Sequence, residues 1–175
     1  MMTNKKTIWT EAGMPGLVLG LIPVVCVALN AITGSSVVAV VLWLAKLVGC
    51  AWLMYAFMKK FVSLHSDAGN SDAFLFGVIV ALLSAFVYSA FNYLYSTLLK
   101  PDMYSEAFET MMQNYNSMLD ANTKEQLENL IPKLPVIGLF ANLVYCFVYG
   151  TVLSAIFSRT IVPQNPFESD HIDEQ

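Results

Sequence analysis

The stretch that decides the fold is Ala73 to Leu99, AFLFGVIVALLSAFVYSAFNYLYSTLL, which has no acidic or basic residue. As a helix rising 1.5 Å per residue, it is longer than the hydrocarbon layer of a bilayer, about 30 Å. Three other apolar runs are also long enough to cross it: Ala12 to Leu29, Val37 to Met58 and Val136 to Phe157. Continuous runs favour helices over barrel strands. The sequence therefore predicts an all-α, polytopic membrane protein, a four-helix transmembrane bundle.

The composition supports this fold class. Of the 175 residues, 57% are hydrophobic and 13% are charged, whereas soluble domains have about 25% charged residues. An ordinary soluble enzyme domain is excluded. We expect residues 1–162 to form the transmembrane domain. Residues 163–175 contain two prolines and four acidic side chains without apolar periodicity, which predicts a disordered cytoplasmic tail.

Lysine and arginine in the flanks of the spans predict the orientation, because these residues are retained in the cytoplasm during insertion. With the N-terminus inside, the inner side has Lys5, Lys6, Lys59, Lys60 and Arg159, and the outer side has Lys100, Lys124 and Lys133. This distribution favours an orientation with both termini in the cytoplasm.

Residues that carry catalysis or bind metals do not cluster in this sequence. Cys26, Cys50 and Cys146 all fall within predicted spans, and His65 and His171 lie far apart. A thiol inside a membrane helix usually serves as a small apolar filler, and no histidine accompanies these cysteines to activate one. The sequence predicts no catalytic residue, metal site or cofactor, and it has no basic cluster typical of nucleic-acid binding.

Lys46 is the only charged residue inside the predicted spans. An ammonium group at mid-helix costs about 2.5 to 3.5 kcal/mol on insertion, so it normally faces protein or water. Counting residues from the outer surface puts Ser89, Asn92, Asn142 and Tyr145 at the same depth. These five residues are a candidate polar site for an anionic lipid headgroup or a partner's carboxylate. The alternative is that Lys46 snorkels to the outer interface.

Small residues indicate where helices pack closely. Gly16 and Gly20 form a GxxxG step in the first span, and the third span has a ladder of small residues at spacing four: Gly77, Ala81, Ala85 and Ser89. Such residues let membrane helices approach each other closely. They serve either packing within the chain or a homo-oligomer.

The segment from residue 100 to 135 predicts an amphipathic helical hairpin on the outer face, between the third and fourth spans. Its first helix has an apolar stripe with period 3.6, which includes Phe108, Met111, Met112 and Tyr115. A capping-box pattern at Thr123 and Gln126 predicts the start of the second helix. Charges near the stripe are acidic, which argues against adsorption to anionic lipids. The stripe therefore either caps its own bundle or binds a protein partner.

The chain resembles a family of four-helix inner-membrane proteins of unknown function from Bacteroidota. The resemblance rests on the run from Phe74 through Tyr88 and Tyr95, and on Lys100-Pro101-Asp102 with the acidic, methionine-rich helix after it. The Lys59-Lys60 pair and the closing Asn165-Pro166-Phe167-Glu168 also fit. Members are often encoded beside a membrane-associated glycosyltransferase of the polyprenyl-phosphate type. By association alone, the resemblance implies such an enzyme as the protein partner.

Three classes of function follow from these observations. A non-catalytic accessory or scaffolding subunit fits a membrane bundle with an exposed apolar stripe. The alternative is a small transporter or a lipid-binding membrane protein with a polar pocket around Lys46, although coupled transport usually needs carboxylates at membrane depth. An enzyme ranks last, because no nucleophile or metal site accompanies the acidic residues of the hairpin.

Overall fold

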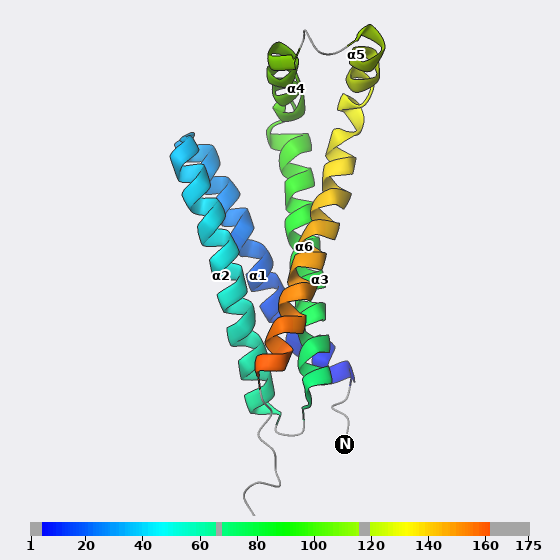
Figure 1. The fold of residues 1–175 in the computed structure, drawn as a ribbon. Helices are drawn as coiled ribbons and strands as arrows, with labels where there is room; N and C mark the ends of the chain where they lie inside the picture. Colours follow the sequence, from blue (N-terminus) through cyan, green and yellow to red (C-terminus); the bar gives the residue numbers. More distant parts are fainter. Residues whose placement is uncertain (1–4, 66–67, 116–119, 162–175) are drawn as a thin grey trace, which may run out of the picture.

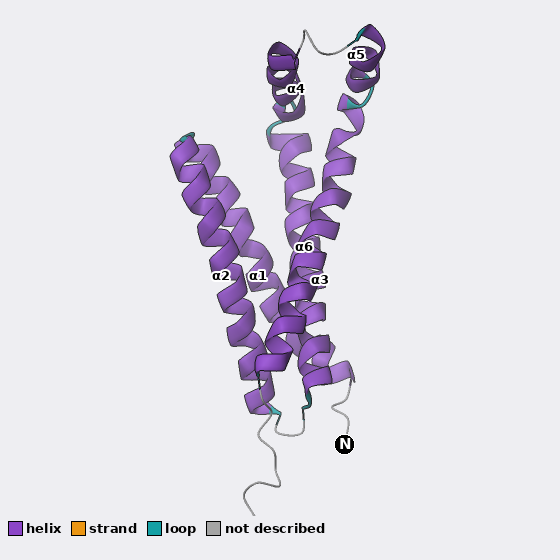
Figure 2. Ribbon diagram, viewed as in Figure 1, coloured by secondary structure: helices purple, strands orange, loops and turns teal. Residues whose placement is uncertain are grey.

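The computed structural model describes residues 5–65, 68–115 and 120–161, and every regular element in these residues is a helix (Figures 1 and 2). Four helices are long and apolar enough to cross a membrane. The chain is therefore an all-α, multi-pass membrane protein. The predicted tail, residues 163–175, lies outside the described residues. In chain order the elements are α1 (Lys5–Thr33), α2 (Ser36–Leu64), α3 (Asn70–Leu94), the π-helix η1 (Tyr95–Leu99), α4 (Met103–Tyr115), α5 (Ala121–Glu128), the 3₁₀ helix η2 (Ile131–Lys133) and α6 (Leu134–Thr160).

Helix α3 is central, because α1 and α6 both pack along it. On the α1 side, a methyl group built on Gly16 or Gly20 would lie only 2.6 Å from Leu83 Cβ or 2.8 Å from Val87 Cβ. The GxxxG step of α1 thus faces α3 of the same chain. Without these glycines the two backbones could not approach so closely.

The small-residue ladder of α3 faces α6. A methyl group on Gly150 would lie 2.5 Å from Ala81 Cβ, and one on Gly77 would meet the side chain of Ser154. Ser154 Oγ donates a hydrogen bond to the carbonyl oxygen of Phe74 at 2.8 Å. Ala85 and Ser89, the other two members of the ladder, are fully buried. In the described structure these residues therefore serve contacts within one chain.

The large buried side chains gather at the α2–α3 end of the bundle. Met54, Met58, Phe61 and Phe76 are almost completely buried, and the rings of Phe61 and Phe76 stack with centroids 4.3 Å apart. At the same end His65 Nε2 lies 3.4 Å from Glu11 Oε1, which joins α2 to the first turns of α1. The helices are therefore packed tightly where the chain passes from α2 to α3.

The opposite end of the bundle is open. Figure 1 shows the α1–α2 pair diverging from α3 and α6 toward the α1–α2 loop. Along α1 the last buried residue is Pro23, which lacks the N–H that would bond the carbonyl one turn earlier and so favours a bend. Gly34, with φ of 60°, closes the short α1–α2 loop in the left-handed conformation that ends many helices.

Helices α4 and α5 extend the bundle at its open end. Figure 1 shows α4 beyond the end of α3 and α5 beyond the start of α6. The α5 helix begins at Ala121, ahead of the predicted cap at Thr123. Asp120 Oδ1 accepts the Thr123 N–H at 3.1 Å, so the aspartate three residues earlier is the capping side chain, which is a preferred residue at that position.

Candidate functional site

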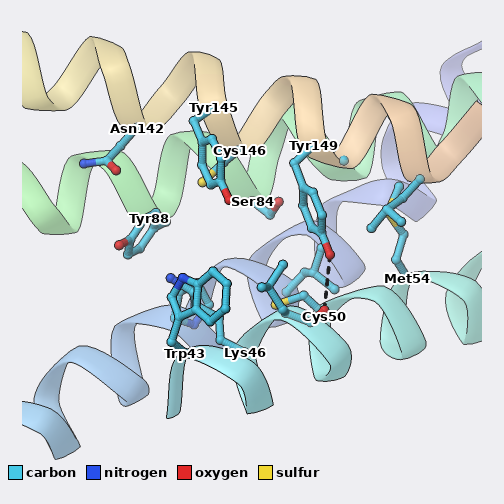
Figure 3. Close-up of a pocket in the computed structure, with 15 residues that line it drawn as sticks. Trp43, Lys46, Cys50, Met54, Ser84, Tyr88, Asn142, Tyr145, Cys146 and Tyr149 are labelled. Carbon is cyan, nitrogen blue, oxygen red and sulfur yellow. Dashed lines mark hydrogen bonds between the residues drawn. The ribbon is translucent and has the colours of Figure 1, made fainter. Parts of the chain in front are cut away.

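A crevice enters the bundle between the two diverging helix pairs, and all four long helices contribute to its wall. The part of the crevice farthest from the α1–α2 loop is a cavity of about 100 Å³, called the lower cavity below. It is mainly apolar, with a few polar side chains. Figure 3 shows α2 on one side and α3 and α6 on the other. The cavity is lined by Leu19, Pro23, Trp43, Lys46, Leu47, Cys50, Met54, Ser84, Tyr88, Asn142, Tyr145, Cys146, Tyr149, Gly150 and Leu153.

Lys46 brings a positive charge into this crevice. It follows the first residue of α2 by ten positions, or about 15 Å along the helix axis. Its side chain is half-buried, and Nζ lies 5.5 Å from the centroid of the Tyr88 ring on α3. A cation at this distance is attracted by the face of the ring. The ammonium group therefore points into the crevice rather than outward from the bundle.

The charge of Lys46 is not neutralised within the described part of the chain. None of the residues that line the lower cavity is Asp or Glu, and no ion pair of Lys46 occurs among the described residues. An ammonium group so placed, in largely apolar surroundings, retains the ability to bind an anion.

Two of the four predicted neighbours of Lys46 line the same cavity and two do not. Asn142 and Tyr145 of α6 are in its wall. Ser89, a member of the α3 ladder, is instead buried, and its Oγ has no hydrogen-bond partner among the described residues. Asn92 lines a separate cavity nearer the α1–α2 loop. Counting residues gives depth but not rotation about the helix axis, and successive residues differ in direction by about 100°.

Several residues of the crevice did not emerge from the sequence as site residues. Tyr88 precedes Ser89 by one position and therefore points in a different direction. Tyr149 Oη donates to the carbonyl oxygen of Leu47 at 3.3 Å, which ties α6 to α2 beside the cavity. Cys50 and Cys146 face the cavity as free thiols. The sequence signal that could have indicated these residues is the spacing of four between Ser84 and Tyr88, and between Tyr145 and Tyr149, which puts each pair on one face of its helix.

Two more cavities continue the crevice toward the α1–α2 loop. A middle cavity of about 140 Å³ shares Pro23, Trp43 and Lys46 with the lower one. An outer cavity of about 470 Å³ shares Val27, Asn30 and Ala39 with the middle one. The three cavities form a row with Lys46 in its lower half. Among the described residues that line them, none is acidic.

The predicted partner surface on α4 stands apart from the crevice. Phe108 and Met112 are half-buried and Met111 is exposed, while the side chain of Tyr115 is outside the described part. At the start of α4, the Tyr104 hydroxyl packs so closely on Gly138 that a Cβ there would lie 2.6 Å away. Helix α4 is thus anchored to α6 at its base.

Comparison with protein families identifies the chain. A family model described as "Protein of unknown function (DUF4199)" matches residues 15–159, and the chain belongs to this family. Comparison with curated proteins and with solved structures gives no match. The matched segment begins in α1 and ends in α6, so it includes the whole crevice and the α4–α5 extension.

Proposed function

We propose that this member of the DUF4199 family is a non-catalytic membrane protein that binds an anionic lipid in the Lys46 crevice. One observation carries the proposal. Lys46 Nζ lies in a crevice between helices long and apolar enough to cross a membrane, over the Tyr88 ring, and none of the described residues in the crevice wall is acidic. Even partial burial of a charge costs desolvation free energy, which a partner of opposite charge can offset. A lipid phosphate that enters from the surrounding membrane can supply that partner.

The surroundings of Lys46 favour a lipid over a small soluble anion. Trp43, Leu47 and Met54 line the lower cavity, which suits hydrocarbon, and a phosphate oxygen near Nζ would form a charge-assisted hydrogen bond. The described residues of the crevice wall include no Asp or Glu. This supports lipid binding over coupled transport, because proton- or ion-coupled carriers usually have carboxylates at membrane depth.

The second part of the proposal is an accessory role. The α4–α5 extension stands beyond the bundle (Figure 1), which supports an amphipathic surface for a protein partner rather than a cap over the crevice. That surface comprises Phe108, Met111, Met112 and Tyr115. On the basis of the family resemblance alone, we propose that the partner is a membrane-associated glycosyltransferase of the polyprenyl-phosphate type. In this role the bound phospholipid or polyprenyl phosphate would be held beside the enzyme.

The proposed location is the bacterial inner membrane, with both termini in the cytoplasm. The distribution of lysine and arginine supports this orientation. It puts the open end of the crevice and the α4–α5 extension on the outer side, so the lipid would enter from the outer leaflet.

Lipid binding is tested by native mass spectrometry of the purified protein with phosphatidylglycerol and, as a zwitterionic reference, phosphatidylethanolamine. We expect Lys46→Met to weaken phosphatidylglycerol binding about 10- to 100-fold, because a hydrogen bond to a charged group contributes about 1.5 to 3 kcal/mol. Lys133→Met removes the same charge at an exposed position outside the crevice and should leave binding unchanged. Equal binding to Lys46→Met and the parent protein would refute the proposal.

The accessory role is tested by purification of the tagged chain in mild detergent, followed by mass spectrometry. A glycosyltransferase should co-purify with the parent protein and with Thr110→Glu. It should be lost from Met111→Glu, which puts the same charge on the proposed surface. If no glycosyltransferase is recovered, or if both variants retain it equally, the proposed partner or its docking surface is wrong.

A further inference from the structure

We infer that the lipid of the Lys46 crevice has a large, hydroxyl-rich headgroup, which occupies the outer cavity. This inference rests on the proposed function and specifies its ligand class. The crevice is apolar at its lower end and polar at its outer end. We expect this difference to favour one class of anionic lipid over another.

The outer cavity has the side chains that bind hydroxyl groups. Asn30, Asn92, Ser35, Tyr95 and Lys100 line it, together with the glycine of the α1–α2 loop. Amide and hydroxyl groups both donate and accept hydrogen bonds, and a polyhydroxylated ring presents both kinds of partner. At about 470 Å³ the cavity is also within the range of small-molecule sites, roughly 300 to 1,000 Å³. A bare phosphate would leave most of this space empty.

A π-helical turn brings two of these residues to the same wall. The backbone N–H of Lys100 donates to the carbonyl oxygen of Tyr95 at 2.9 Å, which is the i→i+5 bond of a π-helix. In an α-helix, residues five positions apart would point about 140° away from each other. The wider turn lets Tyr95 and Lys100 both line the outer cavity. Such turns often occur at functional sites.

The other end of the crevice is apolar and fixes the direction of the ligand. The lower cavity is mainly apolar, with Leu19, Leu47 and Leu153 in its wall. The hydrogen bond from Tyr149 to the Leu47 carbonyl oxygen separates it from an apolar groove of about 440 Å³ between α2 and α6. The row of cavities therefore runs from apolar surroundings, past the Lys46 ammonium group, to a polar chamber. A lipid bound with its chain in the lower cavity and its phosphate near Lys46 would project its headgroup into the chamber.

The inference is tested by comparing phosphatidylinositol with phosphatidylglycerol of the same acyl chains, because each has one phosphodiester and the inositol ring has more hydroxyl groups. In native mass spectrometry we expect phosphatidylinositol to bind about tenfold more tightly. Asn92→Leu and Asn30→Leu should each lower the affinity for phosphatidylinositol more than that for phosphatidylglycerol, so that this preference falls about fivefold. An unchanged thermal unfolding midpoint shows that the variants are folded. Asn114→Leu, at an exposed position on α4, is the matched control.

The outcomes separate the two proposals. If phosphatidylglycerol binds in a Lys46-dependent way but phosphatidylinositol binds no more tightly, the headgroup inference is wrong and the proposed function stands. A preference for phosphatidylinositol that survives both asparagine variants would also overturn the inference. If neither lipid depends on Lys46, the proposed function fails and the headgroup inference fails with it.

Discussion

The contact between Gly150 of α6 and Ala81 of α3 gives the sharpest prediction about the bundle. A methyl group on Gly150 would lie 2.5 Å from Ala81 Cβ and 3.3 Å from Ala81 Cα, whereas carbon atoms pack at about 3.5 to 4.0 Å. The first contact is therefore about 1 Å too short, and the helices must separate to relieve it. We expect Gly150→Ala to destabilise the protein by about 1 to 3 kcal/mol, the usual effect of overpacking.

A compensating exchange makes this prediction specific. The double variant Gly150→Ala with Ala81→Gly moves the methyl group from α3 to α6 and removes the shorter contact, so it should recover most of the lost stability. Gly49→Ala is the control, because no atom of the described residues with which it could clash lies within 4 Å of the added methyl group. It should be neutral or more stable, by no more than about 1 kcal/mol.

The measurement is the thermal unfolding midpoint in mild detergent. A loss of 1 to 3 kcal/mol corresponds to a decrease of roughly 2 to 12 °C for a chain of this size. The reasoning is refuted if Gly150→Ala unfolds at the temperature of the parent protein. It is also refuted if the double variant is no more stable than Gly150→Ala, since the clash with Ala81 would then not be the cause.

Three other predictions follow from the fold and the site. For topology, a single cysteine at Ser117 in a cysteine-free background should react with an impermeant reagent added to spheroplasts, and one at Ser169 should be protected; the reverse pattern contradicts the orientation. Hydrogen bonds from the Thr123 hydroxyl and N–H lower the pKa of Asp120, so capping of α5 should be complete above the ordinary value near 3.8 and lost as pH falls through the lowered pKa. Hydrogen exchange at the Thr123 amide checks this, and equal protection at about pH 6 and about pH 2 would count against it. Tyr88→Leu should weaken binding of phosphatidylglycerol up to about tenfold, whereas Tyr88→Phe keeps the ring and should bind as the parent does; equal binding by both variants would show that the ring does not position Lys46.

The sequence predicted the membrane-spanning helices because hydrocarbon imposes a length and a composition on them. The helices extend beyond the apolar runs. The first run begins at Ala12, whereas α1 begins at Lys5. Hydrogen bonding within a helix does not stop where the apolar composition does, and so a helix can continue through polar residues beyond the hydrocarbon layer.

The candidate site was only partly predictable for a geometric reason. The cost of an ammonium group in the membrane identified Lys46 from the sequence alone. The neighbours of Lys46 depend on how α3 is rotated, and this rotation follows from its two packing faces, one against Gly20 of α1 and the other against Gly150 of α6. Neither pairing of helices can be read from hydropathy. The position of Tyr88 beside Lys46 could therefore be recognised only in the structure.

The most direct test of the central claim is whether the Lys46 ammonium group contacts a lipid phosphate in a membrane. Solid-state NMR can detect this through nitrogen-15 to phosphorus-31 dipolar coupling, with lysine Nζ labelled and the protein in bilayers that contain phosphatidylglycerol. The Lys46 resonance is the one that is missing from Lys46→Met. We predict phosphorus dephasing of this resonance, consistent with a direct hydrogen bond of about 2.8 Å from Nζ to a phosphate oxygen. A Lys46 resonance without such dephasing, in a protein whose exposed lysines do show it, would contradict the account.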